Sequence, residues 1–147
     1  MGPIHILGVE LRTTNEGGRA FQDIPPFWQQ FFQNNIAGSI PNKASEDIYG
    51  VYTHFDNEGK NNLGMYSLII GCEVNTDAKC PTTLTSITIP KSQYHVFSVA
   101  SSKPEKVGEK WQEIWEIPAS EKKNWSFTCE FEHYKAKGGI DIYIGLK

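Results

Sequence analysis

The feature that most constrains this 147-residue chain is an order of secondary-structure elements that occurs twice. Each half predicts a strand, an amphipathic helix and a two-stranded hairpin, in that order. In the first half the elements are residues 4–14, 24–36, 47–56 and 63–74. In the second half a strand pair precedes the helix, and the elements are residues 84–90, 94–100, 104–117, 125–135 and 140–147. We therefore predict an internal duplication, with halves of about residues 1–75 and 84–147.

The two predicted helices share local sequence. Residues 28–32 read Trp-Gln-Gln-Phe-Phe, and residues 111–115 read Trp-Gln-Glu-Ile-Trp. In the first helix Pro25 and Pro26 would occupy the first turn, where a missing N–H costs nothing. Asp23, which precedes them, would then be the N-cap. Both helices carry large apolar side chains at intervals of three and four, so each has one face that must be buried.

A unit of this kind cannot bury the apolar face of its helix alone. Pairing of two units predicts an α+β fold in which β-α-β-β units form one curved antiparallel sheet with two helices on one face. The whole chain, residues 1–147, would be a single domain. A groove would then run between the helices, along the pseudo-two-fold axis, and this is where we expect a ligand.

Composition excludes several classes of protein. The chain has 14 Lys and Arg against 17 Asp and Glu, and this net charge of −3 argues against nucleic acid as a partner. No apolar run is long enough to span a membrane, and the first residues lack the features of a signal peptide, so we expect a cytoplasmic protein. Its three cysteines and four scattered histidines form no metal-binding motif, so no metal and no cofactor are expected.

Two carboxylates lie close together in the predicted strand of residues 125–135. Alternation places Glu130, Glu132 and Tyr134 on one face of this strand. The other face would carry Phe127, Cys129, Phe131 and His133. Either the two glutamates face water, or one of them is buried in the aromatic groove, where an unpaired carboxylate would attract a cation. Alternation alone favours neither alternative.

Several segments together resemble the GyrI-like superfamily, the effector-binding domain that is also attached to AraC-type and MerR-type regulators. The segments that carry this resemblance are residues 8–15, 24–28, 48–52, 66–74, 87–90, 94–97, 111–115 and 131–134. The resemblance implies binding of amphipathic, often cationic, small molecules and a groove carboxylate in the penultimate strand. Glu132 matches that position, with Glu130 and Glu73 as alternatives. The aromatic residues of the implied site are Trp111, Trp115, Tyr49, Trp28 and Tyr134.

The resemblance also limits the role. The chain shows no helix-turn-helix pair, so we expect no DNA-binding domain and a stand-alone effector-binding protein, of the kind found on mobile gene cassettes. The leading hypothesis is a non-catalytic sensor or sequestering protein for lipophilic or cationic small molecules. One alternative is a small-molecule hydrolase that uses Glu132 with Tyr134 or Tyr49. Another is an inhibitor that acts through protein contact, as in topoisomerase inhibition, with a homodimer or a regulatory protein as its partner.

Overall fold

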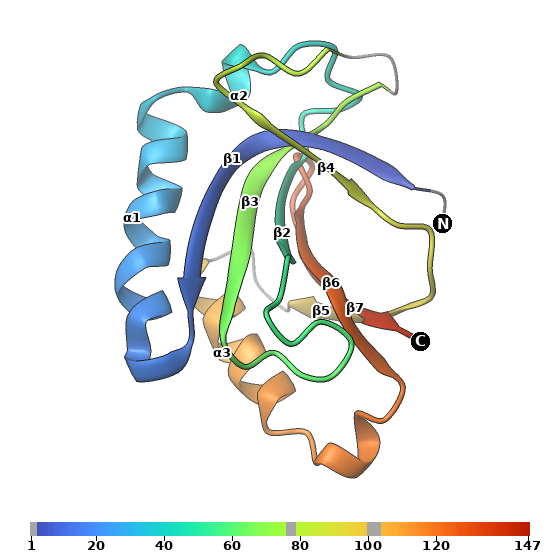
Figure 1. Ribbon diagram of the computed structural model, residues 1–147. Helices are drawn as coiled ribbons and strands as arrows, with labels where there is room; N and C mark the ends of the chain where they lie inside the picture. The colour runs from blue at the N-terminus through green and yellow to red at the C-terminus, as the bar shows by residue number, and fades with distance from the viewer. Residues whose placement is uncertain (1–2, 76–78, 100–103) are drawn as a thin grey trace.

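One seven-stranded antiparallel sheet forms the centre of the molecule, and two longer helices pack on the same side of it (Figure 1). The computed structural model describes residues 3–75, 79–99 and 104–147. The strands are β1 Ile4–Thr14, β2 Ile48–Thr53, β3 Met65–Glu73, β4 Thr85–Ile89, β5 Tyr94–Val99, β6 Trp125–Tyr134 and β7 Ile140–Leu146. The helices are α1 Arg19–Gln33, α2 Ile36–Ser39 and α3 Pro104–Trp115, with short 3₁₀ turns η1 Glu16–Gly18 and η2 Ala119–Glu121. The expected α+β fold is confirmed.

The sheet has the order β4-β1-β3-β2-β6-β7-β5, so β2 and β6 lie at its centre. On one side of this pair follow β3, the hairpin partner of β2, and then β1, which leads into α1. On the other side follow β7, the hairpin partner of β6, and then β5, which precedes α3. At the centre Gly50 pairs with Glu132 and Val51 with Phe131. This arrangement fits the predicted duplication, which stays a prediction.

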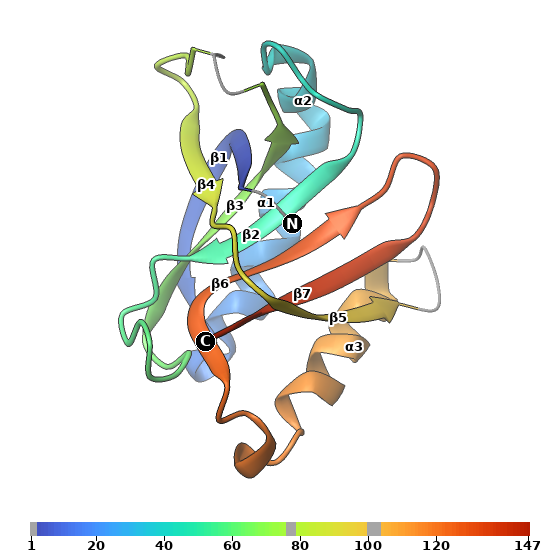
Figure 2. The ribbon, with the colours of Figure 1, turned by 90° about the vertical axis from the view of Figure 1, so that its right-hand side faces the viewer.

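The predicted strand pair at residues 84–90 and 94–100 is wrong. β4 pairs with β1 and β5 pairs with β7, at opposite edges of the sheet. Pro90 has no N–H to donate to a hairpin ladder, and the chain instead crosses the sheet face opposite the helices to reach β5 (Figure 2). Ala100, the predicted end of the second strand, lies outside the described residues.

Helix α1 also differs from its prediction. It begins at Arg19, after Gly18 in a left-handed conformation, and it ends at Gln33. Asp23 is therefore not an N-cap but an interior residue, whose carboxylate accepts hydrogen bonds from Thr13 (2.9 Å) and Arg19 (3.2 Å). The two prolines lie inside the helix, where their missing N–H groups leave carbonyls of the preceding turn without an intrahelical partner.

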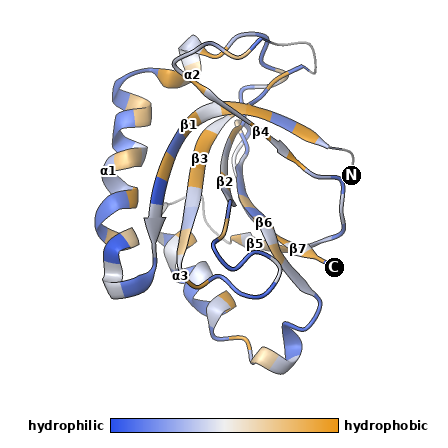
Figure 3. Cartoon of the chain, in the orientation of Figure 1, coloured by the Kyte–Doolittle hydropathy of each residue, from blue (hydrophilic) through white to orange (hydrophobic). Residues whose placement is uncertain are grey.

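Both faces of the sheet carry apolar clusters, and apolar residues concentrate in the strands (Figure 3). The sheet is strongly curved (Figure 1), and the backbones of β1 and β3 lie very close together where Gly8 pairs with Gly71. A Cβ at Gly8 would lie 2.1 Å from the Ile70 carbonyl oxygen, and one at Gly71 would lie 2.0 Å from that of Leu7. Only glycine permits such a close approach of two backbones. The helices cover one side of this curved sheet and leave a hollow between them.

Candidate functional site

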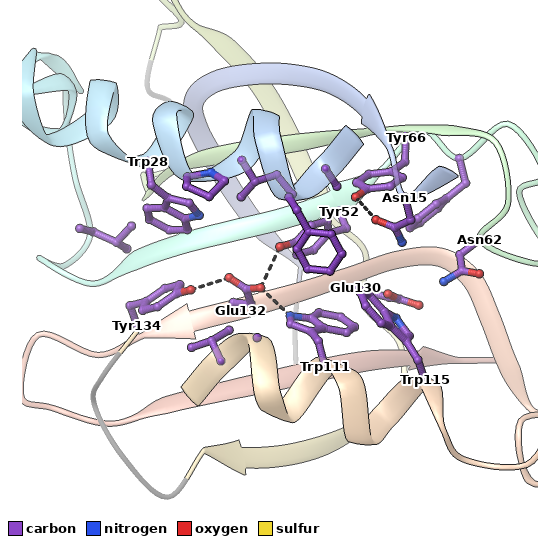
Figure 4. A pocket seen from close by; sticks show the side chains of 18 of the residues that line it. Asn15, Trp28, Tyr52, Asn62, Tyr66, Trp111, Trp115, Glu130, Glu132 and Tyr134 are labelled. Atoms are coloured by element: carbon purple, nitrogen blue, oxygen red, sulfur yellow. Dashed lines mark hydrogen bonds between the residues drawn. The ribbon is translucent and has the colours of Figure 1, made fainter. Parts of the chain in front are cut away.

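A cavity of about 540 Å³ lies between α1 and α3, above the helix-facing side of the sheet. Its floor comes from β2, β3 and β6, and its walls come from the two helices (Figure 4). Aromatic rings and aliphatic side chains make up most of the lining. The acidic residues of the lining and the aromatic residues around them are Trp28, Tyr52, Tyr66, Trp111, Trp115, Glu130, Glu132 and Tyr134.

Glu132 lies on the floor of the cavity with 2% of its surface exposed. Three neutral donors hold its carboxylate (Figure 4). Oε2 accepts hydrogen bonds from the Trp111 indole Nε1 (2.6 Å) and the Tyr52 hydroxyl (2.8 Å), and Oε1 accepts one from the Tyr134 hydroxyl (2.5 Å). Burial raises the pKa of Glu132 above its ordinary value, because it outweighs the opposing effect of these three hydrogen bonds, which favour the ionised form. The donor set is therefore suited to a carboxylate anion.

No positive charge accompanies this carboxylate among the residues that the structure describes. The described lining of the cavity contains no Lys, Arg or His. The hydroxyls of Tyr52 and Tyr134 remain protonated donors, because burial first, and the nearby Glu132 charge second, raise the pKa of both. Since a buried anion without a counter-ion is costly, the cavity is electrostatically suited to a cation.

Aromatic side chains from both helices surround the carboxylate. On α1, Trp28 stacks on Phe32 (6.1 Å between ring centroids) and meets Tyr134 edge-on (5.0 Å). On α3, Trp111 meets Tyr52 edge-on (5.4 Å) and lies 5.9 Å from Trp115. Ring faces attract cations through their quadrupoles, so the walls and the floor favour the same kind of guest.

A second carboxylate, that of Glu130, also lines the cavity, and the residue is 6% exposed. Burial raises the pKa of Glu130 to about 7, and the positive charge of Lys122 lowers it to a smaller extent. Both glutamates face the helices, as the alternation of β6 predicts. The two alternatives left open by the sequence are therefore resolved: neither carboxylate faces bulk water on an exposed sheet.

Five of the six aromatic and acidic residues expected in the site line this cavity: Glu132, Trp111, Trp115, Trp28 and Tyr134. Tyr49 does not. It lies on the opposite face of the sheet, where its ring stacks on His133 (4.4 Å between centroids) and packs against Phe131. Tyr49 and Tyr52 are separated by three positions on β2, so their side chains lie on opposite faces of the sheet. Tyr52 therefore occupies the position in the cavity that was expected for Tyr49. Glu73, at the end of β3, does not line the cavity either.

Among the lining residues that were not expected in the site, two are tyrosines of the floor. Tyr52 and Tyr66 reach the cavity from the neighbouring strands β2 and β3. Because Tyr52 pairs with Glu130, strand alternation places both side chains on the same face of the sheet.

The expected position of Phe127, beside Phe131, is wrong. A register break between Trp125 and Glu130 and a positive φ of 50° place Phe127 with Trp125 on the helix-facing side.

Within the described ranges, no group of three or more His, Cys, Asp or Glu side chains could hold a metal ion. The described helices include none that is both long and apolar enough for a membrane span. Cys72 and Cys129 are buried thiols, and Cys80 is exposed.

Comparison with known proteins agrees with this architecture. The model of the Cass2 family, described as integron-associated effector binding protein, matches residues 2–146. The structure of SAV2435 bound to tetraphenylphosphonium superimposes with a TM-score of 0.81 at 22% identity, covering 100% of this chain and 90% of that one. VCH_CASS2, an integron cassette protein from the mobile metagenome of Vibrio cholerae, gives a TM-score of 0.77 at 22% identity, covering 100% and 92%. Comparison with curated proteins found no match.

Proposed function

Because this chain belongs to the Cass2 family of integron-associated effector binding proteins, we propose that it binds lipophilic aromatic cations in the cavity between α1 and α3. In this proposal it acts as a stand-alone sensor or sequestering protein and does not transform its ligand. The observation that carries the proposal is the buried Glu132 carboxylate, which has three neutral donors and no positive partner among the described residues.

In this proposal, charge and apolar surface contribute separately to binding. Glu132 supplies the negative charge that a neutral aromatic compound cannot use. Trp28, Trp111 and Trp115 supply flat apolar faces, whose burial contributes about 25 cal/mol per Å² whether or not the ligand is charged. One central charge and several ring faces specify little else, so the proposed selectivity is for a class of ligand rather than for one compound.

A relative of the same fold supports this ligand class. SAV2435 was solved with tetraphenylphosphonium, a cation whose charge is enclosed by phenyl rings. Such a cation has no N–H or O–H to donate, so it is recognised by charge and ring contacts alone. The Glu132 cavity offers both kinds of contact.

The alternative of a hydrolase is less well supported by the same contacts. A tyrosine that acts as nucleophile or base needs a lowered pKa, but the surroundings raise the pKa of both Tyr52 and Tyr134. Both hydroxyls donate to Glu132, so each proton is already directed at the carboxylate. This arrangement favours hydrogen bonding to the carboxylate over activation of either hydroxyl as a nucleophile.

The test is calorimetric titration with tetraphenylphosphonium and with the neutral compound triphenylphosphine oxide. We expect Glu132→Gln to weaken binding of the cation by roughly ten- to a hundredfold, equivalent to about 1.4–2.7 kcal/mol, and to leave binding of the oxide nearly unchanged. Glu116→Gln removes the same charge from an exposed residue outside the cavity and should change neither affinity.

Thermal unfolding would first establish that Glu132→Gln is folded. Trp28→Ala provides a second variant that keeps the carboxylate, and it should weaken both compounds to a similar extent. Equal affinity of the wild type and Glu132→Gln for the phosphonium would refute the role of the charge. Absence of saturable binding by either compound to the wild type would refute the proposed function.

A further inference from the structure

The two carboxylates of the cavity are held very differently. Glu132 accepts three hydrogen bonds. Glu130, although only 6% exposed, accepts none from any residue that the structure describes. No fully buried side-chain oxygen of the described residues lacks a hydrogen-bond partner, so the Glu130 oxygens, which accept no described bond, keep accessible surface and open into the cavity. The arrangement leaves the acceptor capacity of Glu130 to whatever enters the cavity.

Lys122 is the basic residue with the clearest influence on Glu130, but it is engaged elsewhere. Its ammonium group donates to the backbone carbonyl of Trp115 (2.9 Å) and lies over the Trp125 ring, 5.2 Å from the centroid. No ion pair within 4.0 Å joins Lys122 to Glu130 in the described part of the chain. Lys122 therefore lowers the pKa of Glu130 through its electrostatic field but forms no ion pair that would neutralise the carboxylate.

Glu130 also marks a change in the character of the site. It lines the aromatic cavity and, in addition, an adjoining hollow of about 470 Å³. This hollow has polar side chains that the cavity around Glu132 lacks, among them Glu16, Asn61, Gln112 and also Lys122, whose ammonium group is held by the Trp115 carbonyl. In Figure 4 Glu130 lies with Trp115 on the side of Glu132 toward Asn62. A second cationic group would be accommodated better here than among the rings.

The spacing of the two carboxylates is set by the strand. Glu130 and Glu132 are two residues apart on β6 and share a face, so their backbones are separated by about 7 Å. A ligand that presents one charge to Glu132 and extends along β6 therefore reaches Glu130 within a short aliphatic chain. A ligand with one charge would remove water from the Glu130 carboxylate without pairing with it, and this desolvation would reduce the binding free energy.

We propose that Glu130 forms a second anionic subsite, and that the cavity prefers aromatic dications whose second positive charge lies in the polar hollow. The aromatic cation occupies the walls beside Glu132, and an ammonium group on a short chain pairs with Glu130. This inference rests on the proposed function, since it assumes that cations bind beside Glu132.

Ethidium and propidium form a matched pair of probes. They share the phenylphenanthridinium ring, and propidium carries an additional quaternary ammonium on a three-carbon chain. At about pH 8 Glu130 is ionised, since its pKa is about 7. We expect the wild type to bind propidium roughly tenfold more tightly than ethidium, and Glu130→Gln to remove most of this preference while changing ethidium affinity less than about twofold.

Glu132→Gln should weaken both dyes alike, and Glu116→Gln should weaken neither. Equal affinity of the wild type for the two dyes, or an equal effect of Glu130→Gln on both, would overturn the second subsite while ethidium binding still supported the proposed function. Absence of binding of either dye and of tetraphenylphosphonium would instead remove the proposed function on which the inference rests.

Discussion

Strand β6 has one face that is filled and one that is open. On the filled face, Phe131 stacks on Tyr143 at 4.4 Å between centroids and meets Tyr94 edge-on at 5.4 Å, so aromatic rings occupy the space between strands. On the open face, Glu130 and Glu132 line a cavity whose rings come from both helices and from the strand residues Tyr52, Tyr66 and Tyr134. Alternate residues of one strand thus belong to a packed core and to the cavity between the helices.

This comparison shows what makes aromatic residues into a site. Tyr49 and Tyr134 belong to the two central strands, β2 and β6, but Tyr49 stacks on His133 and its hydroxyl makes no hydrogen bond among the described residues. Tyr134 donates its hydroxyl to a carboxylate in the cavity. Aromatic content alone therefore does not identify the binding residues; the carboxylate that organises their polar atoms does.

The largest expected effect is a difference in stability loss between substitutions on the filled face and on the open face of β6. Phe131 is 1% exposed, so Phe131→Ala should lower the free energy of unfolding by about 3–5 kcal/mol. Trp28→Ala on the open face should cost about 1 kcal/mol of stability but weaken binding of aromatic cations roughly tenfold. Chemical denaturation and calorimetric titration measure the two quantities. Phe131→Leu provides a milder variant if the alanine variant does not fold. A larger affinity loss in Phe131→Leu than in Trp28→Ala would contradict the division between faces.

The next effect is a pH dependence of stability caused by Glu130. Its pKa is about 7 in the folded chain against an ordinary 4.5, so the unfolded chain releases this proton first as the pH rises. Stability should therefore fall between about pH 4.5 and 7 and stay low above that, by at most about 3 kcal/mol from this residue. Glu130→Gln should remove this contribution and be more stable than the wild type at pH 8. Denaturation curves of both proteins across this range give the difference, and parallel pH profiles would contradict the assignment.

The smallest effect compares two tyrosine hydroxyls. Tyr134→Phe removes a donor from the Glu132 carboxylate and should cost roughly 1.5–3 kcal/mol at pH 8. Tyr49→Phe removes a hydroxyl without a described partner and should change stability by less than about 0.5 kcal/mol. Equal losses in the two variants, measured by denaturation at this pH, would show that the hydrogen bond to Glu132 contributes little.

Much of this fold follows from the sequence, because strand alternation and helical spacing are local properties. The same alternation places Glu130, Glu132 and Tyr134 on one face. The start of α1 could not be predicted from caps, because Pro25 and Pro26 are accommodated inside the helix. The position of β4 depends on pairing with the distant β1, which no local pattern encodes.

Of the residues predicted for the site, Glu132, Tyr134 and those on the helices line the cavity, whereas Tyr49 on β2 does not. Trp28, Trp111 and Trp115 lie on apolar helix faces that must be buried against the sheet. Choosing between Tyr49 and Tyr52 requires the register of β2 against β6, a long-range property. The hydrogen bonds that hold Glu132 join residues up to 80 positions apart, so sequence spacing could not have shown them.

The Glu132 anion has a consequence for the lifetime of the chain. A buried charge without a counter-ion lowers the stability of the empty protein, and a cation that binds only the folded state restores it. At a hundredfold excess over the dissociation constant, this stabilisation amounts to about 2.7 kcal/mol. A difference of that size changes how often a chain unfolds and meets a protease. The amount of protein in a cell would then rise with the concentration of its ligand, without any change in its synthesis.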